Sequence, residues 1–385
     1  MVDKVLAPSS AAEVAEALRA AAADGRAVQV RGAGTKSHWG GASSTVDTVI
    51  ETRRLRGVTA HEPGDLVATV GAGTPLHDVA GVLGLAGQRL ALEAGSPTAT
   101  VGGVLAAAEA GPLRLRYGTG RDLLIGVEFV RPDGVIAHSG GRVVKNVAGY
   151  DLGKLLCGSY GTLGVITSAT FRLHPLPAER AWVSCPVSSV TELPDLVGRA
   201  MAPAVQPSAV EVNLTSASGT QGTLSVLVEG SAVGVPVRAE AAKQALGDRA
   251  AVGPEPRWWG QYPFLFDAIA LKLAVAVGRL GTVLDALFAA AGPDVTVRGS
   301  AGTGVLHVAL PGDTAPAELE GVLRAVRAAI GGIRYGSCVV LAAPETVREA
   351  VDIWGPVPGL DLMRRVKERF DPQHRMAAGR FVGGI

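Results

Sequence analysis

The stretch VQVRGAGTKS, residues 28–37, decides the fold, because it joins a strand pattern to a turn of small residues. Two valines alternate with a glutamine and an arginine over residues 28–31, which is the period of a half-buried strand. Three small residues follow, and they let backbone N–H groups line a concavity that suits an anion. The residues predicted to contact a phosphate are Arg31, Gly32, Ala33, Gly34, Thr35 and Lys36.

The turn departs from the two commonest phosphate-binding loops. A Walker loop needs the order G-x-x-x-x-G-K, whereas Thr35 separates Gly34 from Lys36. A dinucleotide fingerprint needs a third glycine where this chain has Ser37, and the following HWGGASSTVDT has no helical period. Taken alone, the stretch fits either a ligand-binding loop or an ordinary structural turn.

Length and composition predict two or three domains with sizeable cores. The chain has 385 residues, of which 48% are apolar and 18% charged. The formal net charge is +1 and no basic run stands out, so nucleic acid is not an expected partner. The N-terminal MVDKVLAPSS lacks the apolar core of a leader peptide, and no apolar run is long enough to span a membrane. We therefore expect a cytoplasmic protein.

The three cysteines, Cys157, Cys185 and Cys338, are far apart in the sequence. An iron–sulfur cluster needs four closely spaced ligands, so none is predicted in this chain. We expect the cysteines to be buried as small apolar side chains.

A second loop of small residues, GSPTATVGGVLAA at residues 95–107, leads into a predicted helix. Gly102 and Gly103 would let the start of that helix lie against a ligand, with its positive dipole end toward a phosphate. One such loop is common in proteins. Two of them, each beside a strand or a helix start, favour a dinucleotide held between two subdomains.

The patterns around these loops alternate between helix and strand. A helix is predicted over AAEVAEALRAAAADG, because Ser9 or Ser10 can cap it, Glu13 lies at capping-box distance from Ser10, and Gly25 ends it. The segments VDTVIET and LVATVG read as strands, and a helix is predicted to begin at Thr74 and Pro75. A hairpin is predicted from YGTGRDLLIGVEFVR at residues 117–131 and VIAHSGG at 135–141, with its turn at Asp133 and Gly134.

The segments that follow resemble a known family. KNVAGYD at residues 145–151, GSYGTLGVIT at 158–167 and the C-terminal MRRVKERFDPQHRMAAGRFVGGI are similar to the FAD-binding p-cresol methylhydroxylase and vanillyl-alcohol oxidase superfamily. Within it, they are most like the smaller FAD-binding subunit of bacterial three-component glycolate oxidases. The resemblance covers residues 1–178 and 355–385 well, and the middle only in outline.

The resemblance implies an α+β fold in three parts. These are a two-subdomain FAD-binding domain of the vanillyl-alcohol oxidase type (1–178), a ferredoxin-like antiparallel cap domain (179–354) and a C-terminal segment returning to the FAD domain (355–385). The strand and helix patterns after residue 179 fit that cap, with helices on one face of its sheet.

The same resemblance implies a set of residues that bind FAD beyond the first turn. They are Ser96, Thr98, Thr100, Gly102, Gly103, Gly161, Gly164, Val165 and Ile166. Some relatives attach FAD to a histidine directly after the first turn. Thr35 stands at that position here, so we expect non-covalent FAD.

The residues that would act on the substrate are less clearly indicated by the sequence than those that would bind FAD. Tyr150, Lys145 and Asn146 are candidate catalytic residues, because oxidation of an alcohol needs a group that takes the hydroxyl proton. Larger relatives carry histidine and glutamate metal ligands in the cap, whereas the cap segment here has only His307, and we predict no metal site.

Two functions therefore remain open at this stage. The chain either oxidises glycolate or a related small 2-hydroxy acid, or it relays electrons or supports assembly beside a larger FAD-binding subunit; a stand-alone oxidase is a third alternative. In either complex we expect an iron–sulfur subunit as electron acceptor. The aromatic WWGQYPFLF at residues 258–266 is predicted either to contact that partner or to line the boundary between cap and FAD domain.

Overall fold

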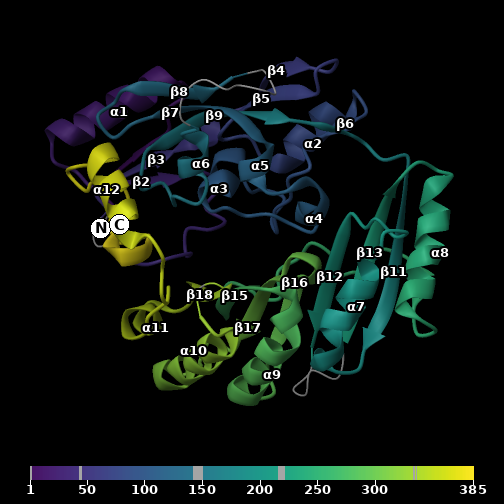
Figure 1. Ribbon diagram of the computed structural model, residues 1–385. Coiled ribbons are helices and arrows are strands. Elements are labelled where there is room, and N and C mark those ends of the chain that lie inside the picture. Colours follow the sequence, from purple (N-terminus) through teal and green to yellow (C-terminus); the bar gives the residue numbers. More distant parts are fainter. Residues whose placement is uncertain (1, 43–45, 142–150, 216–221, 333, 335) are drawn as a thin grey trace. The chain divides into compact units, whose positions relative to one another are not determined.

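The computed structural model describes residues 2–42, 46–141, 151–215, 222–332, 334 and 336–385. They form two compact units (Figure 1). The first unit contains Met1–Ala110, Tyr117–Leu176 and Gly359–Ile385, and the second contains Gly111–Arg116 and Pro177–Pro358. The short segment Gly111–Arg116 thus packs with the second unit although it lies in the middle of the predicted FAD-binding domain.

The first unit contains two main sheets. A parallel sheet has the strand order β1-β3-β2, and an antiparallel sheet has the order β4-β5-β9-β7-β8. Their strands are β1 (Lys4–Leu6), β2 (Val28–Arg31), β3 (Thr48–Glu51), β4 (Val58–Glu62), β5 (Val67–Gly71), β7 (Leu124–Val130), β8 (Ile136–Gly140) and β9 (Val165–Arg172). A two-stranded ribbon pairs β6 (Gln88–Arg89) with β10 (His174–Pro175).

Helices pack against both sheets of this unit. They are α1 (Ala11–Ala23), α2 (Leu76–Gly84), α3 (Val101–Ala106), α5 (Gly120–Leu123), α6 (Gly153–Leu156) and α12 (Leu360–Phe370), with 3-10 turns η1 (Thr52–Arg54) and η5 (Val382–Gly384). The predicted cap of α1 is confirmed, since Ser10 Oγ accepts the Glu13 N–H at 3.2 Å. The short α4 (Arg114–Tyr117) spans the boundary between the two units.

The second unit is a repeat of one motif. Its eight-stranded antiparallel sheet has the order β14-β11-β13-β12-β16-β17-β15-β18. Each half of the chain runs strand, helix, strand, strand, helix, strand, and each half contributes four adjacent strands. These are β11 (Glu179–Val187), β12 (Ala209–Leu214), β13 (Gly222–Gly230) and β14 (Ala251–Gly253), then β15 (Ile269–Val275), β16 (Thr296–Ser300), β17 (Val305–Leu310) and β18 (Gly336–Ala342). The predicted ferredoxin-like cap is therefore two complete ferredoxin-like units joined by β12 and β16.

One apolar core joins this sheet to its main helices. The helices are α7 (Leu193–Ala200), α8 (Gly234–Leu246), α9 (Leu280–Ala291), α10 (Pro316–Ile330) and the short α11 (Glu345–Ala350), with 3-10 turns η2 (Val190–Glu192), η3 (Val277–Arg279) and η4 (Ala301–Thr303). Alternate residues of each strand, such as Leu271 and Leu273 of β15, enter this core. Cys185 and Cys338 are buried in it as small side chains.

Strands β1 and β4 are absent from the sequence-based prediction. β1 is three residues long at the edge of its sheet, and three of the five residues of β4, VTAHE, are polar, so neither gives a clear strand pattern. Within the described ranges, none of the helices is both long and apolar enough to cross a membrane.

Candidate functional site

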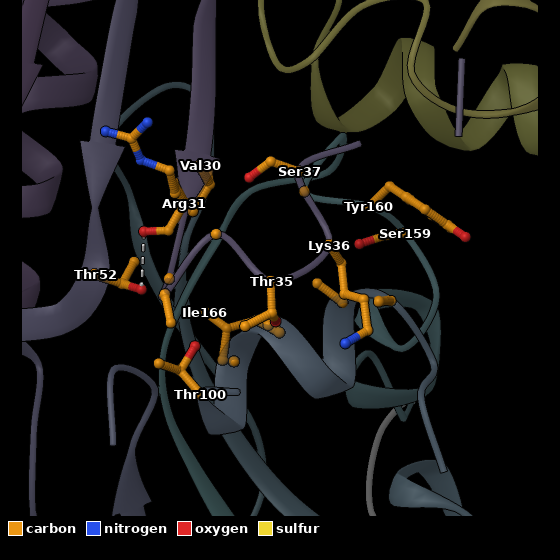
Figure 2. A pocket seen from close by; sticks show the side chains of 18 of the residues that line it. Val30, Arg31, Thr35, Lys36, Ser37, Thr52, Thr100, Ser159, Tyr160 and Ile166 are labelled. Atoms are coloured by element: carbon orange, nitrogen blue, oxygen red, sulfur yellow. Dashed lines mark hydrogen bonds between the residues drawn. The ribbon is translucent and has the colours of Figure 1, made fainter. Parts of the chain in front are cut away.

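The first unit contains a pocket, partly open to solvent, that is lined by both small-residue loops. Figure 2 shows side chains of the first turn, Thr100, Ser159 and Tyr160 around it. Most residues proposed to bind FAD line this pocket. They are Arg31, Gly32, Ala33, Gly34, Thr35, Lys36, Thr100, Gly102, Gly103, Gly161, Gly164 and Ile166.

Three residues of the same prediction lie elsewhere. Ser96 and Thr98 hydrogen-bond each other at 3.0 Å in an exposed part of the second loop, outside the pocket lining. Val165 is fully buried in the core beneath α1, although its neighbour Ile166 reaches the pocket.

The first turn takes its position from the parallel sheet. Arg31, at the end of β2, lies opposite Glu51 in the register with β3, and their side chains form an ion pair of 2.7 Å. The hydrogen bond from Arg31 holds the pKa of Glu51 below its usual value. Gly34 has φ +80°, a conformation that favours glycine, and its carbonyl accepts the Ser37 N–H at 3.1 Å.

Lys36 connects the two small-residue loops. Its Nζ lies 3.1 Å from Glu109 Oε1, which also accepts the Gly95 N–H at 2.8 Å. The Glu109 side chain is completely buried, and that of Lys36 is 12% exposed. Lys36 Nζ also lies 5.1 Å from the centroid of the Trp39 ring. Both predicted cations of the first turn, Arg31 and Lys36, are thus paired with carboxylates of the protein.

Thr100 brings the second loop against the first turn. A Cβ atom added to Gly32 would overlap Thr100 Oγ1, so only glycine fits this contact. The Thr100 hydroxyl is buried and has no hydrogen-bond partner among the residues of the described ranges. Since Thr100 lines the pocket, its hydroxyl is available to a ligand with hydrogen-bonding oxygens.

Gly102 and Gly103 serve different purposes at the start of α3. A Cβ on Gly102 would lie 2.9 Å from Ala72 Cβ, and the Gly102 N–H donates to Ala72 O at 2.8 Å. Gly102 is therefore required for packing on the residue after β5. A Cβ on Gly103 would approach only Thr100 Oγ1, at 3.1 Å, so Gly103 presents bare backbone to the pocket.

The opposite wall of the pocket is the turn that contains Tyr160 and Gly161. Tyr160 has φ +55°, which is uncommon for a residue with a side chain, and its N–H donates to Ala106 O at 2.9 Å. Burial raises the pKa of Tyr160 to about 12. Gly161 has φ +79°, and the chain continues from it toward β9.

The C-terminal segment closes the pocket from a distant part of the sequence. Arg380 donates from Nη2 to Lys36 O at 2.7 Å, and its guanidinium lies 5.6 Å from the Tyr160 ring centroid. The buried Lys367 of α12 fixes this segment, because its Nζ donates to Thr162 O and to Met376 O, both at 2.9 Å. Arg380 thus belongs to the lining of the pocket.

Three important residues of the site were not among the residues predicted to form it. Glu109 is a single acid at the end of an alanine-rich run, whereas Tyr160 and Lys367 lie within the segments that resemble the family. The sequence signal at Glu109 is a charged residue within an apolar run. If such a run is buried, its acid needs a partner of opposite charge.

The candidate catalytic residues Tyr150, Lys145 and Asn146 lie outside the described residues. Within the part of the chain that the structure describes, no three histidine, cysteine, aspartate or glutamate side chains come together as metal ligands. His307 lies on β17, where its ring contacts Tyr262 with centroids 4.7 Å apart.

The aromatic stretch 258–266 packs largely on its own unit. Trp259 contacts Trp182 of β11, with centroids 6.2 Å apart, and Tyr262 stacks on Phe264 at 4.9 Å. Leu265 and Phe266, at its end, are 80% and 82% exposed. Most of the stretch is thus accounted for by contacts within the second unit, and its proposed contact with a partner stays a prediction.

The fold and the pocket define a protein with a dinucleotide-binding unit and a separate antiparallel α+β unit. Residues 2–140 match the family described as FAD binding domain. The buried Thr100 hydroxyl and the bare backbone at Gly32 and Gly103 fit a cofactor with phosphate oxygens.

Curated relatives match parts of the chain. It is 36% identical over 164 residues to glycolate oxidase subunit GlcE of Escherichia coli, covering 42% of this chain and 46% of that protein. It is 34% identical over 188 residues to D-lactate dehydrogenase of Archaeoglobus fulgidus, covering 49% of this chain and 42% of that protein. The chain thus matches a little under half the length of these two relatives.

A solved structure shares the fold over nearly the whole chain. Alkyldihydroxyacetonephosphate synthase matches with a TM-score of 0.70 at 17% identity, covering 97% of this chain and 76% of that one. At this identity the likeness concerns the fold alone.

Proposed function

We propose that the chain is the FAD-binding subunit of an oxidase or dehydrogenase that acts on glycolate or a related small 2-hydroxy acid. The observation that carries this proposal is the pocket between two small-residue loops in a unit that matches an FAD binding domain. The relatives named as a glycolate oxidase subunit and a D-lactate dehydrogenase support the substrate class, since glycolate and lactate are both 2-hydroxy acids.

The residues of the pocket have separate tasks in this proposal. Backbone N–H groups of residues 32–36, with the Thr100 hydroxyl, would hold the pyrophosphate of the cofactor. Lys36 keeps the turn close to the second loop through Glu109. Tyr160 and Arg380 close the pocket against water on the side of the C-terminal segment. Bound FAD supplies the acceptor for the two electrons that leave the alcohol carbon.

Flavin reduction is the direct test of this function. The purified chain is mixed anaerobically with glycolate or D-lactate, alone and together with its partners, and the flavin absorbance is followed. Bleaching of the flavin in the chain alone supports its own substrate chemistry. Bleaching only with a larger flavin subunit present would instead assign it the role of relay or assembly subunit.

We also propose that the chain works in a complex with a larger FAD-binding subunit and an iron–sulfur subunit. A reduced flavin must pass its electrons on before the next turnover. The relative named as a subunit of glycolate oxidase supports this arrangement. Purification of the tagged chain from its host, with identification of what co-purifies, tests it. A chain that purifies alone and turns over fully with oxygen would contradict the complex.

A further inference from the structure

The segment Gly111–Arg116, which we call the arm, leaves the first unit in the middle of its sequence. It belongs to the second unit, whereas Ala110 before it and Tyr117 after it belong to the first. The chain thus passes from one unit to the other and back over a short distance. Such an excursion can carry a change from one unit to the other if its two ends and its middle are all held in place.

The chain is fixed just before the arm by residues of the cofactor pocket. Glu109 accepts the Gly95 N–H at 2.8 Å and pairs with Lys36 at 3.1 Å, and its own N–H donates to Val104 O at 3.0 Å. Ala108 has φ +48°, an uncommon value for a residue with a side chain, so the chain turns sharply there. A displacement of the arm therefore acts on the carboxylate that joins both small-residue loops.

The chain is fixed again directly after the arm. The Tyr117 hydroxyl accepts from Arg89 Nη2 at 2.8 Å, and the Tyr117 ring lies 4.6 Å from the His174 ring, measured between centroids. Gly118 has φ +80°, and Thr119 begins α5 with a capping box. Both ends of the arm are therefore attached to ordered parts of the first unit.

Leu115 anchors the middle of the arm in the second unit, where its side chain packs against the apolar core. A Cβ atom added to Gly302 of η4 would lie 3.1 Å from Leu115 Cδ2 and 3.1 Å from Val210 Cβ, which is closer than carbon atoms normally pack. Glycine at position 302 thus makes room for the leucine beside β12.

Arg114 gives a second indication that the arm lies close to the second unit. Burial lowers the pKa of Lys272 in β15 to about 8, and the nearby charge of Arg114 adds to this effect. The Arg114 Nε also donates to Gly111 O at 3.2 Å, which closes the arm into a compact turn. A compact turn transmits a displacement of one end to the other better than an extended linker does.

We propose that the arm couples FAD binding to the order of the second unit, with Leu115 as its positioning residue. FAD that contacts both small-residue loops restricts their movement, and Glu109 passes this restriction to the arm. The restricted arm keeps Leu115 in place against Gly302. The proposal requires that the pocket binds FAD, and it does not depend on which substrate the chain acts on.

The coupling must act in both directions. If FAD binding stabilises the contact of Leu115 with Gly302, the same contact stabilises bound FAD by the same factor. Leu115 lies outside the pocket lining, so its effect on FAD has to pass through the arm.

Flavin fluorescence titration of the FAD-free full chain measures one direction. We expect Leu115→Ala to bind FAD about fivefold or more weakly than the wild type does. Gly302→Ala should weaken FAD binding similarly, because its methyl group crowds Leu115 from the other side. The matched control is Val322→Ala in α10, which truncates a buried side chain elsewhere in the same core and should bind FAD as the wild type does.

Hydrogen exchange followed by mass spectrometry measures the other direction. In the wild type and in Val322→Ala, peptides that cover η4 and β12 should exchange about fivefold or more slowly with FAD than without it. This difference should disappear in Leu115→Ala and in Gly302→Ala. A variant that only damages the fold would instead lose protection equally with and without FAD.

Three results would overturn the proposal. They are wild-type FAD affinity in both Leu115→Ala and Gly302→Ala, exchange in η4 of the wild type that does not respond to FAD, and an equal loss of FAD binding in Val322→Ala. In the last case any damage to the second unit would weaken FAD binding, and the arm would have no special role. If Leu115→Ala does not fold, Gly302→Ala decides the question by the same two measurements.

Discussion

Lys36 Nζ lies 3.1 Å from Glu109 Oε1, and the same oxygen accepts the Gly95 N–H at 2.8 Å. One buried carboxylate therefore fixes both small-residue loops of the pocket. Breaking such a pair from one side leaves a buried charge without a partner, which typically destabilises a protein by about 3–5 kcal/mol. The pair thus links the stability of the first unit to its ability to bind FAD.

We expect Glu109→Ala to lower the free energy of unfolding by about 3 kcal/mol and to weaken FAD binding about tenfold or more. Chemical denaturation and flavin fluorescence titration measure the two effects. The control is Asp195→Ala, which removes the exposed Arg199–Asp195 pair and should cost less than about 1 kcal/mol. Equal losses in the two variants would show that the buried pair does not hold the loops together.

A second prediction concerns Asp371, which fixes the C-terminal segment. Asp371 Oδ2 accepts from Lys367 Nζ and from the Met376 N–H, both at 2.7 Å, and both side chains of the ion pair are 1% exposed. Asp371→Ala should cost about 3–5 kcal/mol of stability and release FAD, because Lys367 also holds the Thr162 carbonyl beside the pocket.

The matched control for Asp371 lies in α12, the helix that ends just before Asp371. Asp361 forms an ion pair of 3.4 Å with Arg364, but the Asp361 side chain is 93% exposed. Asp361→Ala should leave both the unfolding midpoint and the FAD content nearly unchanged. If both aspartate variants keep their full FAD content, the C-terminal segment does not close the pocket.

The third prediction is a pH effect at Tyr160. Burial raises the pKa of its phenol from 10 to about 12, and the nearby Arg380 opposes this shift. The folded chain then holds this proton more tightly than the unfolded chain does. The contribution to stability is complete below about pH 10 and is lost as the pH rises from 10 to 12.

Denaturation curves of wild type and Tyr160→Phe between pH 8 and pH 11 test this effect. The stability of the wild type should fall more steeply above about pH 10, by a difference that reaches about 1.4 kcal/mol at pH 11. Parallel curves for the two proteins would mean that the Tyr160 phenol ionises normally in the fold.

The sequence was most informative where function depends on local backbone. The period of β2, the glycine at position 34 with its φ of +80° and the small residues at the start of α3 can each be recognised within ten residues. The same holds for α1, whose cap residue Ser10 stands directly before its first turn.

Contacts between distant residues could not be predicted in this way. Glu109 meets Lys36 across more than seventy positions of the sequence, and Arg380 reaches the first turn from the opposite end of the chain. Likewise, Leu115 and Gly302 meet only through the fold of the second unit. Nothing in RLRYG alone shows that its leucine packs against a glycine far along the chain.

A fourth prediction is that the flavin is bound without a covalent bond to the first turn. Thr35 stands where some relatives carry the attached histidine, and a threonine hydroxyl is not the imidazole nucleophile of that linkage. Precipitation of the protein with acid should therefore leave the yellow colour in the supernatant as intact FAD. Flavin that stays with the pelleted polypeptide would contradict the prediction.

The last prediction uses the contact between Gly32 and Thr100. A methyl group on Gly32 would overlap Thr100 Oγ1, so Gly32→Ala should push the second loop away from the first turn and strongly reduce FAD binding. Thr100→Ala removes the overlapping hydroxyl, and the double variant should therefore bind FAD better than Gly32→Ala alone. Such a compensation is a non-additive effect that only residues in contact produce.

Gly81→Ala is the control for this pair of substitutions. Gly81 lies in α2, and a Cβ added there meets no atom within 4 Å, so alanine should stabilise the helix by about 0.5–1 kcal/mol and leave FAD binding intact. FAD binding is measured by fluorescence titration for all four variants. Thr100→Ala alone should weaken binding less than Gly32→Ala does, since it removes one hydrogen bond and keeps the shape of the pocket. If the double variant binds no better than Gly32→Ala, the two loops do not meet at these residues when FAD is bound.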